Sequence, residues 1–218
     1  MISRRLVQSA CMALVVALAG TGCAPLIVGG VATTGVLIAD DRRTTGSVVD
    51  DQSIELRLGG RLTEEFGKGA NINVTAYNRI ALLTGEVPTD EVRAAAGKAA
   101  AGHPNVRHVQ NELQVAAPSG FSSRSSDTFV TGRVKARLVD NQSRGKSPQV
   151  QANHVKVVTE AGVVFLMGIV SATEADQATE VARTTSGVRR VVRVFEVVAK
   201  PSVTSTPPTP QPQGDPAR

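Results

Sequence analysis

The chain repeats itself, and this internal repeat limits the possible folds more than any other feature. Residues 71–115 return between residues 154 and 197. When Gly85 is placed over Gly168, apolar positions fall on apolar positions: Ile72, Val74, Ile80, Leu82 and Val87 over Val155, Val157, Val163, Phe165 and Val170. After a gap of one residue, Val106, Val109, Leu113 and Val115 fall over Val188, Val191, Phe195 and Val197. Two copies of one structural unit therefore account for most of the chain.

Each copy predicts a hairpin, a helix and a third strand. An alternating strand begins at Ile72 or Val155, and a short turn leads into a more continuously apolar strand, 80–87 or 163–170. Thr89 and Thr173 offer capping hydroxyls to the helix that follows, which is alanine-rich in the first copy. Glycine or proline ends that helix, and an alternating strand comes after it.

A further helix is expected ahead of each hairpin. Ile54, Leu58 and Leu62 recur as Val130, Val134 and Leu138 at helical spacing, and Asp51 and Asp127 each stand three residues ahead of them. The unit is therefore α-β-β-α-β, and the fold class is α+β with two tandem domains. We expect each domain to be a small mixed three-stranded sheet packed by two helices. The second copy carries about seven extra polar residues within 141–154, which predict a loop.

These residues resemble a known family, the BON domain. The resemblance rests on the α-β-β-α-β unit, on the glycine that closes the second strand, and on the strings INVTAYN, VKVVTEAG, VFLMG and SGVRRV. Two such domains behind a lipoprotein leader are similar to the dual-BON periplasmic lipoproteins, over about residues 48–198 and the leader. The resemblance implies a non-enzymatic outer-membrane lipoprotein that faces the periplasm, supports envelope integrity and contacts anionic phospholipid.

The first 22 residues predict a lipoprotein signal peptide. Arg4 and Arg5 precede an apolar run, 6–19, that is too short to span a bilayer. Small residues then lead to Cys23, the expected lipid-modified residue. Cys11 lies in the leader, so Cys23 is the one cysteine of the mature chain and forms no internal disulfide. The alternative is an ordinary cleaved signal followed by a free cysteine.

The boundaries follow from composition. We expect a signal peptide at 1–22, an acylated N-terminus and tether at 23–47, a first domain at 48–116 and a linker at 117–125. A second domain at 126–198 and a disordered proline-rich tail at 199–218 complete the chain. An apolar run at 26–39 is too short to span a membrane, and we expect it to lie against the bilayer or to pack on the first domain.

Charge separates the two domains. Residues 48–116 hold seven Lys and Arg against nine Asp and Glu, a net charge of −2, whereas residues 126–198 hold ten against seven, a net charge of +3. A basic surface attracts anionic lipid headgroups by about 1 kcal/mol for each well-placed cation. The second domain is therefore the expected phospholipid-binding one. Nucleic acid, the competing polyanion, is not an expected partner of an exported lipoprotein.

The first helix of the second domain carries the candidate lipid contact. If Val130, Val134 and Leu138 face the core, Phe129, Arg133 and Arg137 form the adjoining stripe. Phe129 falls over Ser53 of the first copy, so the shared fold does not need an aromatic ring there. An exposed ring beside two cations is suited to the lipid interface. The alternative is that Phe129 packs against the other domain or the linker.

Arg189 and Arg190 begin the last strand. They extend the basic surface to phospholipid, or they keep an exposed edge strand from pairing with other chains. Gly85 and Gly168 are expected to be structural, because a side chain there would meet the packed helix or because the backbone angle requires glycine.

The sequence shows no enzyme motif. The three histidines lack metal-ligand spacing, no glycine-rich phosphate loop follows a strand, and no nucleophile stands in a recognisable motif. We therefore expect no catalysis, no metal and no cofactor. Two classes remain: a module that binds an anionic phospholipid membrane, and a periplasmic adaptor that recruits other envelope proteins.

Overall fold

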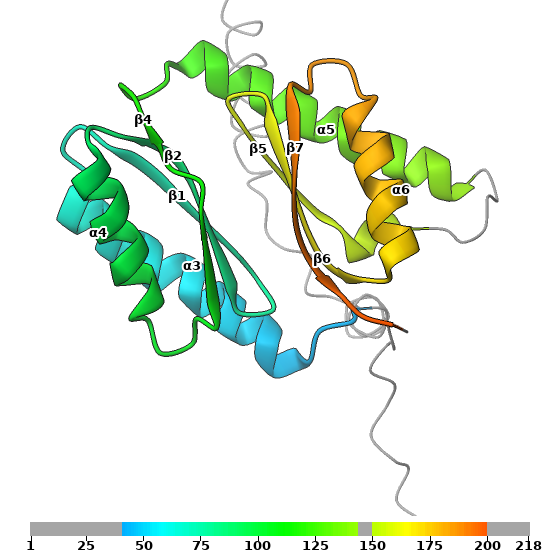
Figure 1. Cartoon of the computed structure of the whole chain (residues 1–218), viewed down its shortest axis with the longest axis horizontal. Coiled ribbons are helices and arrows are strands. Elements are labelled where there is room, and N and C mark those ends of the chain that lie inside the picture. Colours follow the sequence, from blue (N-terminus) through cyan, green and yellow to red (C-terminus); the bar gives the residue numbers. More distant parts are fainter. Residues whose placement is uncertain (1–40, 144–149, 200–218) are drawn as a thin grey trace, which may run out of the picture. The chain divides into compact units, whose positions relative to one another are not determined.

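The computed structural model describes residues 41–143 and 150–199, and within them the repeat appears as two α-β-β-α-β domains (Figure 1). The first domain contains α3 (Thr45–Phe66), β1 (Asn71–Tyr77), β2 (Ile80–Val87), α4 (Asp90–Ala101), β3 (His108–Asn111) and β4 (Gln114–Val115). The second contains α5 (Phe121–Ser143), a 3-10 turn η1 (Ala152–His154), β5 (Lys156–Glu160), β6 (Val163–Val170), α6 (Ala172–Arg183) and β7 (Arg190–Val197). The predicted fold class and element order are confirmed.

Both sheets are mixed, as expected. β1 pairs antiparallel with β2, and β3 and β4 pair parallel with β2; in the second domain β5 is antiparallel and β7 parallel to β6. The domains differ in the third strand, which is continuous in β7 but divided in the first domain after Asn111. There the Asn111 Oδ1 accepts from the Leu113 amide at 3.3 Å, and its Nδ2 donates to the Arg93 carbonyl at 2.9 Å. This local bonding of Asn111 competes with the ladder and interrupts the strand.

The two hairpin turns are built alike. Asn78 and Arg79 have φ of 48° and 64°, and Ala161 and Gly162 have φ of 48° and 73°. Two consecutive positive φ values are typical of a type I′ turn, whose twist matches that of the strands it joins.

An aspartate in the preceding helix holds each turn. Asp51 of α3 accepts from the amides of Asn78 and Arg79, both at 2.7 Å. Asp127 of α5 accepts from the amides of Ala161 and Gly162 at 2.9 and 2.8 Å. The repeated aspartates therefore fix the first helix of each domain to its hairpin. Their equivalent positions were visible in the sequence, but this contact was not predicted.

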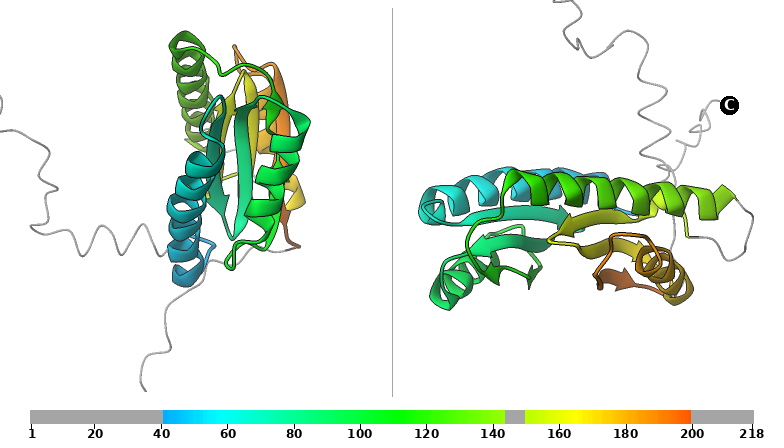
Figure 2. Two further views of the ribbon diagram at one scale, coloured as in Figure 1. Left: turned by 90° about the vertical axis from the view of Figure 1, so that its left-hand side faces the viewer. Right: turned by 90° about the horizontal axis from the view of Figure 1, so that it is seen from above.

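Both helices of a domain pack on one face of its sheet (Figures 1 and 2). In the first domain that face of β2 presents Ala81, Leu83 and Val87, and in the second domain that face of β6 presents Val164, Leu166 and Val170. Because strand side chains alternate, the residues between them point to the opposite face.

The opposite faces of the two sheets pack against each other. A third cluster joins the domains and is made of Tyr77, Leu82, Val163, Phe165, Met167 and Val194, with Ile80, Val158, Ile169 and Val192 partly buried around them. We call it the interdomain cluster. It explains why β2 and β6 are almost continuously apolar: each strand is buried on both faces.

The starts of three helices differ from the expectation. Ser171 rather than Thr173 caps α6, and its hydroxyl accepts from the Glu174 amide at 3.2 Å. The first domain was expected to begin near residue 48, but its first helix, α3, begins at Thr45, because the Thr44 side chain caps it by accepting from the Ser47 amide at 3.1 Å. α5 begins at Phe121, inside the predicted linker 117–125. Serine-rich residues there suggested a turn, but the helix that continues into the core extends back through them. The expected signal peptide, tether and tail lie outside the described residues.

Candidate functional site

The stripe predicted on α5 lies on the surface of the second domain. Val130, Val134 and Leu138 are buried, while the Phe129 side chain is 63% exposed. The Arg133 guanidinium carbon lies 4.3 Å from the centre of the Phe129 ring. Such stacking is a cation–π contact. Phe129 belongs to neither the domain core nor the interdomain cluster, and its high exposure gives no support to the alternative in which it packs against the other domain or the linker.

The two arginines of the stripe use only part of their hydrogen-bonding capacity. Arg133 Nη1 donates to the Ser186 carbonyl at 3.3 Å, and Arg137 Nη1 donates to the Val181 carbonyl at 3.2 Å and to Thr185 Oγ1 at 2.9 Å. A guanidinium has five N–H donors. Within residues 41–143 and 150–199 neither arginine forms a salt bridge, so their charge is not neutralised there.

The corresponding helix of the first domain lacks this combination. α3 has Ser53 in place of the ring, and Arg61 lies 3.6 Å from Glu65. Its exposed apolar side chains are Val49 and Leu56, which are 61% and 78% exposed. An exposed ring stacked on an unneutralised cation is therefore specific to α5.

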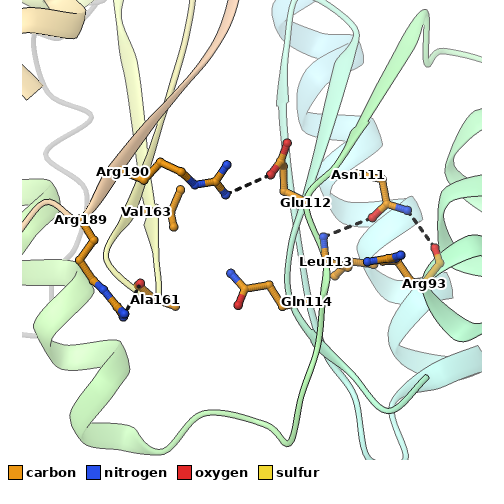
Figure 3. Close-up of a pocket in the computed structure, with 9 residues that line it drawn as sticks. All are labelled: Arg93, Asn111, Glu112, Leu113, Gln114, Ala161, Val163, Arg189 and Arg190. Atoms are coloured by element: carbon orange, nitrogen blue, oxygen red, sulfur yellow. Dashed lines mark hydrogen bonds and ion pairs between the residues drawn. The ribbon is translucent and has the colours of Figure 1, made fainter. Parts of the chain in front are cut away.

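Arg189 and Arg190 line a cavity to which none of Phe129, Arg133 and Arg137 contributes. This cavity of about 630 Å³ lies between the domains and is also lined by Arg93, Asn111, Glu112, Leu113, Gln114, Ala161 and Val163 (Figure 3). Arg190 lies 3.6 Å from the Glu112 carboxylate of the first domain, and Arg189 Nη1 donates to the Ala161 carbonyl at 3.4 Å. Sequence reasoning could not pair Arg190 with Glu112, because the contact depends on how the sheets pack.

A side chain at Gly85 or Gly168 would meet backbone rather than the packed helix, and the other expected reason, a backbone angle that requires glycine, applies to Gly85 but not to Gly168. A Cβ on Gly85 would lie 1.9 Å from the Asn71 carbonyl oxygen, and Gly85 also has a φ of 111°. A Cβ on Gly168 would lie 2.3 Å from the His154 carbonyl oxygen. The obstacle in each domain is the chain that enters the first strand of the hairpin.

The segment before α3 is tied to the second domain, which the sequence did not indicate. Arg42 forms two hydrogen bonds to Glu174, at 2.7 and 2.9 Å, and donates to the Ile169 carbonyl at 2.9 Å. Burial by itself would raise the pKa of Glu174, but the bonds from Arg42 and Ser171 outweigh it and hold that pKa below its ordinary value.

Glu160 is a buried carboxylate between the domains, and within residues 41–143 and 150–199 it forms no salt bridge. Glu160 is 8% exposed and accepts from Asn73 Nδ2 at 3.1 Å. Burial raises the pKa of Glu160, and the nearby carboxylates of Glu86 and Asp127 raise it further.

The lipid-modified cysteine, a metal site and a membrane-spanning helix were also considered from the sequence. Cys23 lies outside the described residues. Within 41–143 and 150–199 no group of three His, Cys, Asp or Glu side chains is arranged to hold a metal ion. In the same residues no helix is both long and apolar enough to cross a membrane.

Comparison with known proteins agrees with the architecture. The BON domain family matches residues 50–117 and 126–199. The chain is 35% identical over 178 residues to "Outer membrane lipoprotein DolP" of Haemophilus influenzae, a match that covers 80% of this chain and 88% of that protein.

Two further relatives align over slightly shorter stretches of both chains. The chain is 38% identical to the "21 kDa hemolysin" of Actinobacillus pleuropneumoniae, over 72% of this chain and 79% of that one. It is 28% identical to "Osmotically-inducible protein Y" of Escherichia coli, over 73% of this chain and 78% of that protein.

Proposed function

The chain belongs to the BON domain family, and on that premise we propose that it is a lipid-anchored outer-membrane protein that binds anionic phospholipid through α5. In this proposal Cys23 carries the acyl chains, the two domains face the periplasm, and the protein supports envelope integrity without catalysing a reaction. Support for the location comes from the relative named an outer membrane lipoprotein, which aligns over most of both chains.

The observation that carries the lipid contact is the exposed Phe129 ring stacked on Arg133. A ring that enters the headgroup region loses water contact, while the guanidinium groups of Arg133 and Arg137 stay at the level of the phosphates. The spare donors of both arginines would bond phosphate oxygens. The same helix face thus offers apolar burial and charge attraction together.

Binding to vesicles by the unacylated protein tests this contact. We expect the protein without residues 1–22, and with Cys23→Ser, to bind anionic vesicles and to bind less as salt screens the cations. Phe129→Glu removes about 2 kcal/mol of ring burial and adds about 1 kcal/mol of repulsion. Together these predict a loss of about a hundredfold in affinity.

Leu56→Glu in α3 is the matched control, because it places the same charge in an exposed apolar position of the other domain. It should leave vesicle affinity unchanged. Equal loss in both variants, or no loss in Phe129→Glu with the fold intact by circular dichroism, would contradict the proposed contact.

The anchor has a separate test. Cys23→Ser in the full chain should move the protein from the membrane fraction to the soluble fraction, since several acyl chains at about 0.8 kcal/mol per buried methylene supply most of the anchoring. Mass spectrometry of the mature N-terminus should find acyl groups on the parent protein. Unmodified Cys23 would rule out the anchor.

A second candidate is an adaptor that recruits other envelope proteins. The observation in its favour is the exposure of Leu56 and Val49 on α3, which belong to no core. An adaptor has no reason to bind pure lipid vesicles, so the vesicle experiment separates the two functions.

A further inference from the structure

The two domains meet in an approximately symmetric way. At each end of the contact an arginine that begins the third strand of one domain meets a glutamate near the end of the third strand of the other, and these two ends differ. Arg107, at the start of the first domain's third strand, pairs with Glu196 near the end of β7. Arg190, at the start of β7, lies 3.6 Å from Glu112 near the end of the first domain's third strand. We call the end with Glu196 the closed end and the end with Arg190 the open end.

The third strands are equivalent residue by residue, which makes the two ends comparable. The Arg107 amide donates to the Arg79 carbonyl at 2.8 Å, and the Arg189 amide donates to the Gly162 carbonyl at 2.9 Å. With this superposition Arg107 corresponds to Arg189, and Glu196 corresponds to Gln114.

At the closed end a carboxylate completes the contact. Glu196 accepts from Asn78 Nδ2 at 2.7 Å and also binds Arg107. Burial alone would raise the pKa of Glu196, but Arg107 and Asn78 reverse this and hold the pKa below its ordinary value. The carboxylate is therefore ionised and held by the other domain.

At the open end the position of that carboxylate is taken by a neutral amide. Gln114 and Arg189 both line the 630 Å³ cavity, and within residues 41–143 and 150–199 Arg189 forms no salt bridge. Arg93 and Arg190 line the same cavity, whereas Glu112 is the one acidic residue in its lining. One oxygen of Glu112, Oε1, accepts from Gln110 Nε2 at 2.6 Å, and the other, Oε2, lies 3.6 Å from Arg190, which is longer than a direct hydrogen bond.

We propose that the open end is a binding site for a small oxyanion, a carboxylate or phosphate group, which takes the place that Glu196 fills at the closed end. Arg189 supplies the principal charge, Arg190 shares its charge between Glu112 and the ligand, and the Gln114 amide donates a hydrogen bond. Figure 3 shows Gln114 between the two domains, in the space that separates Arg189 and Arg190 from the first domain. A cavity of this volume accepts an organic molecule that carries the anion.

Such a ligand would bridge the domains, because Arg189 and Arg190 come from the second domain and Gln114 from the first. This site is separate from the α5 stripe and does not depend on the proposed lipid contact. The anion has two possible sources, a soluble molecule or a lipid headgroup, and both present the same oxygens.

Inorganic phosphate is the first probe, titrated into the unacylated protein while the backbone amides of Gln114 and Gly162 are followed by NMR. Gln114→Glu places a built-in carboxylate opposite Arg189, so we expect it to weaken phosphate binding by at least about tenfold and to raise the melting temperature in phosphate-free buffer. Arg189→Gln should weaken binding to a similar degree without that gain in melting temperature.

Two matched controls share these changes at exposed sites of α3: Gln52→Glu and Arg57→Gln. Both should bind phosphate as the parent does. Binding that does not saturate, or that is equal in all five proteins, would overturn the site.

Vesicles that contain phosphatidic acid distinguish the source of the anion. If they displace phosphate from the parent and from Phe129→Glu alike, the ligand is a lipid headgroup reached independently of α5. If they leave phosphate bound, the ligand is a soluble anion. Either result supports the site, and a failure of Phe129→Glu to lose vesicle affinity bears on α5 alone.

Discussion

The two domains share one fold and differ in the side chains that they expose on its surface. In both, an aspartate of the first helix holds a type I′ turn, a glycine admits the entering chain, and the second strand is buried on two faces. On the surface, α3 carries serine and a paired arginine where α5 carries an exposed ring and unneutralised arginines. The aspartates and glycines that both copies share are therefore structural, whereas the exposed ring of Phe129 and the missing carboxylate partners of its neighbouring arginines are particular to the second domain.

The largest expected effect concerns the shared glycines. Gly85→Ala should lower the free energy of unfolding by about 4 kcal/mol and Gly168→Ala by about 3 kcal/mol, because each methyl group meets a carbonyl oxygen and only Gly85 also needs a positive φ. Denaturant unfolding followed by circular dichroism measures both. Gly132→Ala, where an added Cβ meets nothing within 4 Å, should stabilise the protein slightly. Equal stability of all three variants would show that the fold does not require glycine at positions 85 and 168.

The shared aspartates come next. Asp127→Ala leaves two turn amides without their acceptor and should cost about 2 kcal/mol of unfolding free energy. Asp51→Ala should cost about 3 kcal/mol, because it also removes one of the two carboxylates that bind Arg43, the one at 2.9 Å. Hydrogen exchange should speed up first at Ala161 and Gly162 in one variant and at Asn78 and Arg79 in the other. Unchanged exchange at the turns would mean that the aspartates do not hold them.

The third prediction tests the difference between the helices. Replacing Arg133 and Arg137 with glutamine removes two cations worth about 1 kcal/mol each at an anionic surface, so vesicle affinity should fall by about thirtyfold. The same pair of changes at Arg57 and Arg61 of α3 should have no effect. Vesicle flotation at low salt measures both. An equal loss would show that net charge, rather than the α5 surface, determines binding.

The smallest effect concerns pH. Since the folded-state pKa of Glu160 is raised, ionisation of Glu160 costs stability, and the cost appears as pH rises from the ordinary carboxyl value through the folded-state pKa. Glu160→Gln should therefore stabilise the protein by up to about 1 kcal/mol at pH 7, and the gain should vanish below about pH 4. Thermal melts across this range measure it. A gain that persists at low pH would assign the effect to packing instead of charge.

Sequence patterns were sufficient to predict the fold of each domain, because that fold depends on contacts within the domain. The alternation of Ile72, Val74 and Ala76, the glycine at Gly85 and the helical spacing of Ile54, Leu58 and Leu62 all act within one domain, and each predicted its element. The repeat added a second independent copy of the same signals.

Contacts between the domains could not be predicted in the same way. The continuously apolar β6 shows that both of its faces are buried, yet nothing in its sequence says what covers the second face. Glu112 and Arg190 are 78 positions apart, and their contact follows from sheet packing alone. Similarly, the positive charge of α5 can be counted from the sequence, but only the structure shows that Arg133 and Arg137 lack carboxylate partners in the described region.

The unequal ends of the interdomain contact are possible because the domains lie on one chain. In a homodimer of a single such domain, two-fold symmetry would make both ends identical, so any acid that closed one end would close the other. Joining the copies in one polypeptide removes this symmetry constraint, because the positions of Glu196 and Gln114 are encoded separately and can mutate independently. A duplicated domain can thus keep one contact to hold its halves together while the corresponding contact becomes free to evolve into a receptor site.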